Sequence, residues 1–273
     1  MLKHRILTAL ILVPLVLGGI FYLPTQQLGY ALVFFVVVGA WEWARIVGVH
    51  SPVARIIYAA FVGAILLALS FKPVEKELLL WLFAAVVLWW CVNFVRIAAY
   101  RGELGFRKTE LGLDLFNGIL LLIPTWLGFL FLHGHASKGI EQIVVLMLII
   151  WGADTGAYFA GRCFGKHKLA PKVSPGKTWE GVAGASVVTI VVAIGSLYWL
   201  QIESAYTLYF ILLCIVTMVV SILGDLYESL YKRRAQIKDS GAIFPGHGGV
   251  LDRIDSMTAA APMFSIGLLL LGV

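Results

Sequence analysis

Repeated long runs of apolar residues with few or no charges restrict the folds that this chain can adopt. Runs of roughly 17 to 22 residues have the length that an α-helix needs to cross the hydrocarbon core of a bilayer. Lipid offers the backbone no hydrogen-bond partners, so only helices and closed barrels can span a membrane. These runs are continuous rather than alternating, which argues against a barrel. We therefore expect an all-α polytopic transmembrane bundle.

The composition supports this class, because 60% of the residues are hydrophobic and only 13% are charged, about half the charged share of a soluble domain. The first run follows basic residues like a secretory signal, but it lacks a small-residue cleavage site, so we expect it to be retained. No linker or repeat divides the chain, so we expect one domain, 1–273. The nine expected spans are 6–23, 28–47, 56–71, 78–98, 111–132, 143–160, 182–200, 206–224 and 257–273.

The positions of Lys and Arg predict the orientation, because these residues favour cytoplasmic loops. With nine spans and the N-terminus inside, only Lys72, Lys76 and Lys138 of the 21 Lys and Arg residues fall outside. We therefore expect a cytoplasmic N-terminus and a C-terminus outside. The net charge of +6 would then meet anionic lipid or nucleotide at the cytoplasmic face, and we expect no nucleic-acid partner. Since no targeting extension is visible, we expect the cytoplasmic membrane of a bacterium.

Two polar segments on the expected cytoplasmic side, 153–181 and 224–256, carry carboxylates at the ends of spans. Charges at that depth usually face a water-filled cavity or a bound ion. Asp252 and Asp255 are three residues apart, so both lie on one side of a helix that begins just before them. The alternative is that they only complement the dipole of that helix. With the neighbouring acids, they form the kind of oxygen-rich site that suits Mg²⁺ and substrate phosphates.

Glycines and basic residues in the same segments indicate phosphate binding. Gly248 and Gly249 allow consecutive N–H groups to face an anion, although a plain turn is the alternative. The stretch SPGKT at 174–178 ends like a P-loop, but Pro171 stands where that motif requires Gly. We expect instead a basic loop that binds a triphosphate or lipid phosphate, with Arg162, Lys166, Lys168, Lys172, Ser174, Lys177 and Thr178 as candidates.

Polar residues in the earlier spans receive simpler interpretations. Glu42 lies three residues before Arg45, and we expect the two to form a local pair. Asp114 and Asn117 either line the same cavity as the polar segments or hold helices together.

The second polar segment carries Ser229, Lys232, Arg233, Lys238, Asp239, Gly241, Phe244, Pro245, His247, Gly248, Gly249, Val250, Asp252, Arg253, Ile254 and Asp255. This run of residues resembles the signature of the CDP-diacylglycerol synthases, also called phosphatidate cytidylyltransferases. Tyr231 is one departure, because the family signature is expected to have an aliphatic residue there. The stretches GDLYES at 224–229 and DTGAYFAGRCFGKHKL with SPGKTWEG also resemble the family, whereas the first five spans do so only in hydropathy.

The resemblance implies that CTP and phosphatidate react with Mg²⁺ to give CDP-diacylglycerol and pyrophosphate. It implies metal ligation by Asp225, Asp252 and Asp255. The expected catalytic residues are Asp225, Lys238, Asp239, His247, Asp252, Arg253 and Asp255, and the expected substrate-binding residues are Asp154, Ser229, Lys232, Arg233, Gly248, Gly249 and the basic loop. For His247 we favour a structural or phosphate-binding role, because phosphatidate already offers an ionised oxygen. The sequence leaves open a second metal ion and a homodimer.

Two other functions compete with this one. An ion-coupled transporter also uses buried acids and broken helices, but it would show internal repeats and polar residues at the membrane midplane. A CDP-alcohol phosphotransferase would show a D-G-x-x-A-R pattern, which is absent here. Both are therefore less favoured than cytidylyl transfer.

Overall fold

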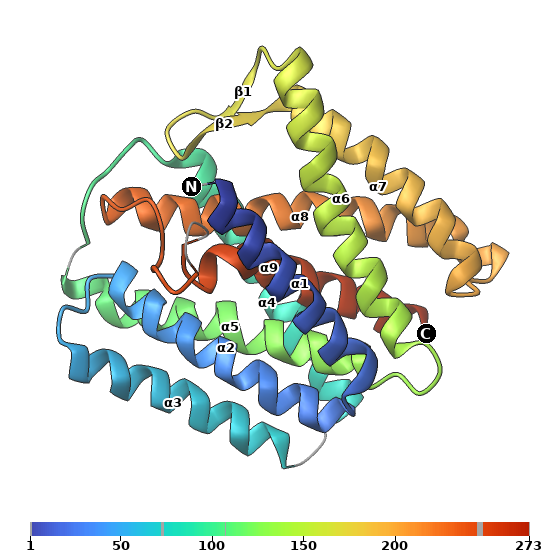
Figure 1. Cartoon of the computed structure of the whole chain (residues 1–273), viewed down its shortest axis with the longest axis horizontal. Coiled ribbons are helices and arrows are strands. Elements are labelled where there is room, and N and C mark those ends of the chain that lie inside the picture. Colours follow the sequence, from blue (N-terminus) through green and yellow to red (C-terminus); the bar gives the residue numbers. More distant parts are fainter. Residues whose placement is uncertain (1, 72–73, 107, 245–247, 273) are drawn as a thin grey trace.

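The computed structural model describes residues 2–71, 74–106, 108–244 and 248–272, and the side chains of these residues other than 2–9, 11, 12 and 108. Long α-helices dominate the described chain (Figure 1). Two short 3-10 turns, Lys108–Glu110 and Ser204–Tyr206, precede α5 and α8. The helices are α1 (Leu2–Tyr22), α2 (Thr25–Ile46), α3 (Pro52–Ser70), α4 (Lys76–Ala99), α5 (Leu111–His133), α6 (Gly139–Phe164), α7 (Trp179–Trp199), α8 (Thr207–Arg234) and α9 (Leu251–Leu271).

The helices α2 to α9 are long and apolar enough to cross a membrane, which confirms the predicted all-α membrane bundle. In the described part of α1, the apolar stretch Val13–Tyr22 is shorter. The expectation of nine spans therefore stays a prediction for this first helix.

Successive helices run back and forth, so their connections collect at two ends of the molecule. The connections after α2, α4, α6 and α8 lie toward the left and top of Figure 1, near the start of α1. Those after α1, α3, α5 and α7 lie toward the right and bottom, as does the end of α9. The predicted site residues that the structure describes therefore belong to one end, which we call the polar end.

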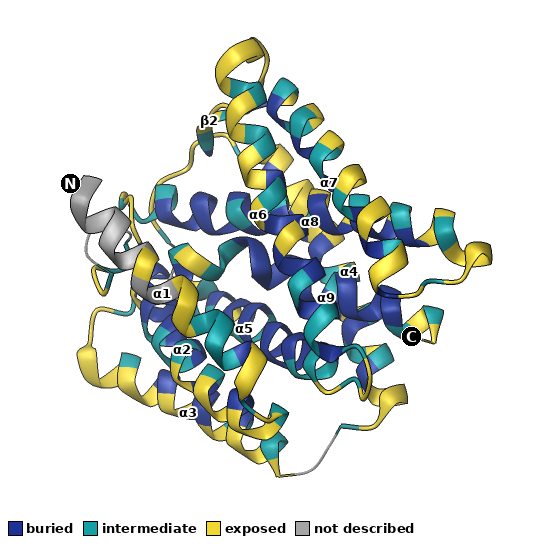
Figure 2. Ribbon diagram, turned by 45° about the vertical axis from the view of Figure 1, so that its right-hand side comes forward, coloured by how far each residue is buried: buried dark blue, intermediate teal, exposed yellow. Residues whose placement is uncertain are grey.

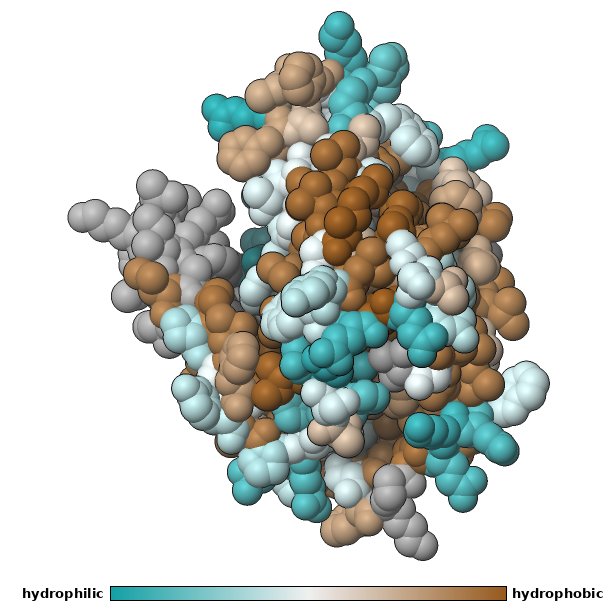
Figure 3. Space-filling model, turned by 90° about the vertical axis from the view of Figure 1, so that its right-hand side faces the viewer, coloured by the Kyte–Doolittle hydropathy of each residue, from teal (hydrophilic) through white to brown (hydrophobic). Residues whose placement is uncertain are grey.

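Burial distinguishes central from peripheral helices. In α5 and α9, 67% of the apolar window is buried inside the protein, compared with 28% in α3, α4 and α7 (Figure 2). Peripheral side chains such as Phe61, Leu88 and Val191 are large, apolar and exposed, as expected for a surface that faces lipid. Seen from the end opposite the site, hydrophobic side chains cover much of the upper surface (Figure 3).

The structure differs from the sequence prediction at the end of α8. The apolar run ends at Gly224, but the helix continues to Arg234. Leu226, Leu230 and the tyrosines between and after them keep a buried face at helical spacing, although charged residues occupy other positions. As a result, the charged residues of 225–234 lie on a helix rather than on a loop.

The structure also corrects the prediction of a basic loop between α6 and α7. Residues Lys168–Ala170 form strand β1 and Ser174–Thr178 form β2, paired as an antiparallel hairpin. The turn is closed by a hydrogen bond from Val173 N to Ala170 O at 3.1 Å. The hairpin gives the basic residues of this segment a defined register, with Lys168 opposite Thr178.

Candidate active site

The site begins where α8 and α9 cross at close range. A Cβ on Gly224 would collide with the backbone oxygen of Asp255 and would lie 3.3 Å from the Ala259 side chain. Glycine therefore allows the two backbones to approach. This approach brings Asp225, the next residue of α8, near Asp255 of α9, and the two carboxylates repel each other.

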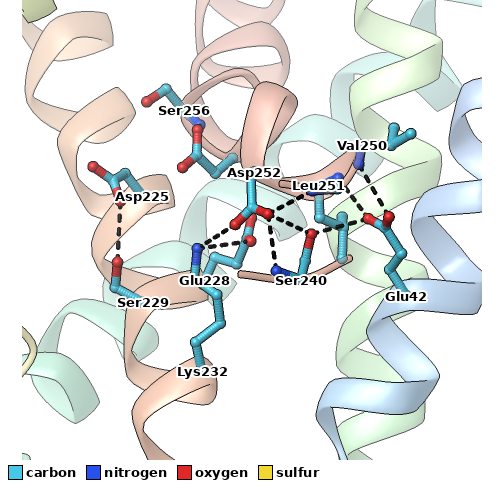
Figure 4. A network of polar contacts seen from close by, with 12 residues as sticks. Glu42, Asp225, Glu228, Ser229, Lys232, Ser240, Val250, Leu251, Asp252 and Ser256 are labelled. Carbon is cyan, nitrogen blue, oxygen red and sulfur yellow. Dashed lines mark hydrogen bonds and ion pairs between the residues drawn. The ribbon is translucent and has the colours of Figure 1, made fainter. Parts of the chain in front are cut away.

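One face of α8 presents a row of polar side chains to this crossing. Asp225, Glu228, Ser229 and Lys232 are spaced so that they follow one another along the same side of the helix (Figure 4). Ser229 Oγ donates a hydrogen bond to Asp225 Oδ1 at 3.1 Å. The extension of α8 beyond Gly224 creates this row.

A single ammonium group joins α8 to α9. Lys232 Nζ lies 2.6 Å from Asp252 Oδ1 and 3.1 Å from Glu228 Oε1. The side chains of Lys232, Glu228 and Asp252 are only 9%, 2% and 6% exposed, respectively. Buried charges of opposite sign depend strongly on each other, because each would otherwise lose its hydration without compensation. The sequence prediction did not include Glu228, although its spacing four residues before Lys232 is a pairing signal.

The second oxygen of Asp252 holds the polypeptide on both sides of the glycine turn. Oδ2 accepts hydrogen bonds from Ser240 N at 2.8 Å, Gly249 N at 2.8 Å and Ser240 Oγ at 2.9 Å. Both oxygens of this carboxylate are therefore engaged by groups of the protein. The phosphate-binding roles of Gly248 and Gly249 stay predictions, because the Gly249 amide points at Asp252 here.

Glu42 reaches the same segment from α2. Its carboxylate accepts hydrogen bonds from Val250 N at 3.1 Å, Leu251 N at 2.9 Å and Ser240 Oγ at 3.0 Å (Figure 4). The expected pair with Arg45 is wrong: Arg45 is exposed, whereas Glu42 is fully buried and faces the start of α9. A spacing of three residues favoured the local pair, and sequence alone gave no sign of partners so distant along the chain.

The hairpin contributes a second cation to the crossing. Lys177 Nζ on β2 lies 2.6 Å from Asp225 Oδ2. Asp154 of α6 interacts electrostatically with both groups, so it belongs to the same cluster. Thr178 Oγ1 accepts a hydrogen bond from Gly181 N at 3.1 Å and caps α7, and its substrate role stays a prediction.

Several predicted phosphate-binding residues contact other parts of the polar end. Arg233 Nε donates to Val173 O at 3.2 Å, and Lys172 Nζ donates to Arg101 O at 3.1 Å. Arg162 donates to the Tyr158 hydroxyl at 2.7 Å. The first two contacts join the hairpin to its neighbours and the third lies within α6. Substrate roles for the three residues stay predictions.

The remaining predicted residues are outside this charged cluster or outside the description. Ser174 belongs to β2 and pairs with Ala170. His247 lies outside the described residues. The exposed ones, whose roles stay predictions, are Lys166, Lys168, Lys238, Asp239 and Arg253.

Asp114 and Asn117 hold helices together, which decides between the two interpretations given to them. Tyr231 of α8 donates to Asp114 Oδ1 at 2.8 Å, and Asn117 Nδ2 donates to the Tyr231 hydroxyl at 3.3 Å. Trp89 of α4 donates to Asn117 Oδ1 at 3.2 Å. The tyrosine that departs from the expected aliphatic residue therefore has hydrogen-bond partners on α5.

An apolar groove of about 440 Å³ lies beside the hairpin. It is formed by α4, the hairpin, α7 and α8, and Leu226 in its lining follows Asp225 directly in the chain. Lys172 and Trp179 also line it. A groove of this kind can receive hydrocarbon next to a charged site.

The carboxylates fit the predicted metal site only in part. Among the described residues, no group of three or more His, Cys, Asp or Glu side chains is arranged to hold a metal ion. Asp225 and Asp255 nevertheless offer oxygen donors from adjacent helices, and Mg²⁺ commonly binds one or two carboxylates with substrate phosphates and water. Both oxygens of Asp252 are engaged by Lys232, Ser240 and Gly249, and those of Asp225 by Ser229 and Lys177, so either carboxylate would have to exchange a partner to bind an ion. Metal ligation by all three stays a prediction.

The fold and the site together define a polytopic membrane protein with a cluster of cationic and acidic side chains at one end of its helical bundle. Residues 3–271 match the family model described as the cytidylyltransferase family. The chain belongs to this family.

Relatives with curated names agree with this assignment. A phosphatidate cytidylyltransferase of Pseudomonas aeruginosa is 41% identical over 97% of this chain and 96% of its own length. One of Haemophilus influenzae is 36% identical over 97% of this chain and 98% of its own length. One of Staphylococcus haemolyticus is 43% identical over 51% of this chain and 54% of its own length.

Proposed function

We infer that this protein transfers the cytidylyl group of CTP to phosphatidate and releases CDP-diacylglycerol and pyrophosphate. The observation that carries this inference is similarity over nearly the full length to relatives named phosphatidate cytidylyltransferase. The geometry of the polar end supports it, because cations and carboxylates lie beside an apolar groove. The three relatives give no support to the transporter alternative.

In the proposed reaction, an ionised phosphate oxygen of phosphatidate attacks the α-phosphorus of CTP. The bond between this phosphorus and the oxygen that bridges to the β-phosphate breaks, and pyrophosphate leaves. Both reactants are anions, so the protein must overcome their repulsion and align them. Catalysis then consists mainly of positioning and of charge stabilisation.

We assign Lys177 and Lys232 to this task. Lys177, on the hairpin, is placed to contact a phosphate when it exchanges its partner Asp225 for substrate. Lys232 holds the Asp252 carboxylate in place and adds positive charge at the crossing of α8 and α9. Bound Mg²⁺, held by Asp225 and Asp255, would neutralise the leaving pyrophosphate.

The groove beside the hairpin suits an acyl chain of phosphatidate. Its lining is mostly apolar, and Leu226 in this lining is the neighbour of Asp225 in the chain. The lipid would place its phosphate near Lys177 while its chain stays in hydrocarbon. CTP would arrive from the aqueous side of the same site.

We also propose that the polar end faces the cytoplasm of a bacterial cell and that the membrane is the cytoplasmic membrane. The distribution of Lys and Arg supports this orientation. CTP is a cytoplasmic nucleotide, so a site on this face needs no nucleotide transport.

The test uses the full chain, purified in detergent and supplied with CTP labelled in the cytidine, phosphatidate and Mg²⁺. We expect the label to enter a lipid-soluble product and pyrophosphate to appear in equal amount, with both depending on phosphatidate. Label that stays in the aqueous phase would contradict the proposed reaction. In liposomes, uptake of a labelled solute driven by an ion gradient would favour the transporter.

A further inference from the structure

Glu42 is a buried acid on α2, which lies outside the polar segment 224–256 that carries the family signature. It is fully buried, and α2 is one of the helices long and apolar enough to cross a membrane. A buried carboxylate is costly unless hydrogen bonds compensate its lost hydration. The groups that donate hydrogen bonds to the Glu42 carboxylate therefore indicate its role.

Among the described residues, the hydrogen-bond donors to Glu42 all belong to the polar segment 224–256. Oε1 accepts from Val250 N at 3.1 Å, and Oε2 accepts from Leu251 N at 2.9 Å. The first N–H groups of a helix have no acceptor within that helix. Glu42 therefore caps the start of α9 from a different helix, where the helix dipole favours negative charge.

Ser240 connects Glu42 to Asp252. Its Oγ lies 3.0 Å from Glu42 Oε2 and 2.9 Å from Asp252 Oδ2, so both carboxylates share one hydroxyl. Asp252 in turn binds Lys232. A shift of Glu42 would therefore pass through Ser240 to the ion pair at the crossing of α8 and α9.

Two glycines of the segment leave room for the Glu42 carboxylate. A Cβ on Gly241 would collide with Glu42 Oε1, and a Cβ on Gly249 would collide with the same atom. Neither residue is among the positive-φ glycines of the described chain. Close approach of Glu42, joined at Gly249 by Ser240 Oγ, therefore favours glycine at these positions rather than backbone conformation.

We propose that Glu42 is a positioning residue for the reaction: it fixes residues 240–241 and 248–252 so that Asp252 and Lys232 keep their places in the site. This inference rests on the proposed function, because it assigns Glu42 to that same site. It gives α2 a role in a site that otherwise comes from the second half of the chain.

The experiment compares Glu42→Gln, Glu42→Asp, Ser240→Ala and the matched control Gln142→Leu. Gln142 is also fully buried in a membrane helix, and neither of its side-chain polar atoms has a hydrogen-bond partner among the described residues. For each variant, kcat, the apparent KM for both substrates and the unfolding temperature are measured on monodisperse protein in detergent.

We expect Glu42→Gln to lower kcat at least about tenfold and to change either KM less than about threefold, because alignment rather than substrate contact is lost. Glu42→Asp keeps the charge and should recover part of kcat. Ser240→Ala should lower kcat in the same way, and Gln142→Leu should leave it unchanged. Wild-type kcat in folded Glu42→Gln and Ser240→Ala would overturn the proposal, as would an effect on unfolding temperature alone.

A double-mutant cycle tests the coupling directly. Gly241→Ala should lower both kcat and the unfolding temperature, because its new Cβ meets Glu42. In a Glu42→Ala background the same change should have a much smaller effect on both, whereas equal effects in the two backgrounds contradict the proposal. If the wild-type protein makes no CDP-diacylglycerol, the proposed function fails, yet the unfolding temperatures still report whether Glu42 holds the segment.

Discussion

Replacing Lys232 by Met removes the ammonium group that forms ion pairs with both Glu228 and Asp252. Methionine fills a similar volume, so the main change is electrostatic. Removing one partner of a buried ion pair costs about 3–5 kcal/mol, because the remaining charge is left without compensation. For a chain of this size, such a loss corresponds to a decrease of at least about 6 °C in the unfolding temperature.

The assay follows unfolding in detergent by the fluorescence of the nine tryptophans. The variant Lys232→Met should unfold at lower temperature, and adding Glu228→Gln should restore part of the loss because one of the two unpaired carboxylates is removed. Asp252 keeps its hydrogen bonds from Ser240 and Gly249 in both variants. Activity should stay low in the double variant, since the ammonium group is still missing. An unfolding temperature of Lys232→Met equal to that of the wild type would refute the reasoning.

Three further predictions concern the substrates and the metal. Asp225→Asn and Asp255→Asn should each lower turnover about 100-fold in folded protein, and wild-type activity of either across a Mg²⁺ titration would contradict its metal role. Lys177→Met should raise the apparent KM for CTP or phosphatidate about tenfold, as expected for a lost charged hydrogen bond; an effect confined to the unfolding temperature would mark Lys177 as structural. Val182→Trp, in the groove, should raise the KM for long-chain but not for short-chain phosphatidate. Val187→Trp, on the exposed side of the same helix, is its control and should change neither.

Hydropathy located the helices well, because burial in lipid depends on length and composition. It placed the end of the eighth span at Gly224, whereas α8 continues to Arg234. The mean hydropathy of a sequence window falls when the window includes charged residues, even where Leu226 and Leu230 keep one face of the helix buried. Periodicity would have detected this extension.

The site was predictable where its residues are close in sequence. The three-residue spacing of Asp252 and Asp255 places both on one side of α9 once the helix begins at Leu251. Contacts between distant segments were not predictable in this way. The wrong pairing of Glu42 with Arg45 shows that a local partner is favoured when nothing in the sequence marks one on another helix.

The hydrogen bonds between distant helices have a consequence for the synthesis of the protein. Ser240 follows Glu42 by 198 residues, so at about 5–20 residues per second the ribosome delivers this partner only about 10–40 s later. Tyr231 likewise follows Asp114 by 117 residues. During this interval the early helices carry polar groups that lipid cannot satisfy. A nascent chain that stops before α8 would expose these groups in the bilayer and present a target for membrane proteases.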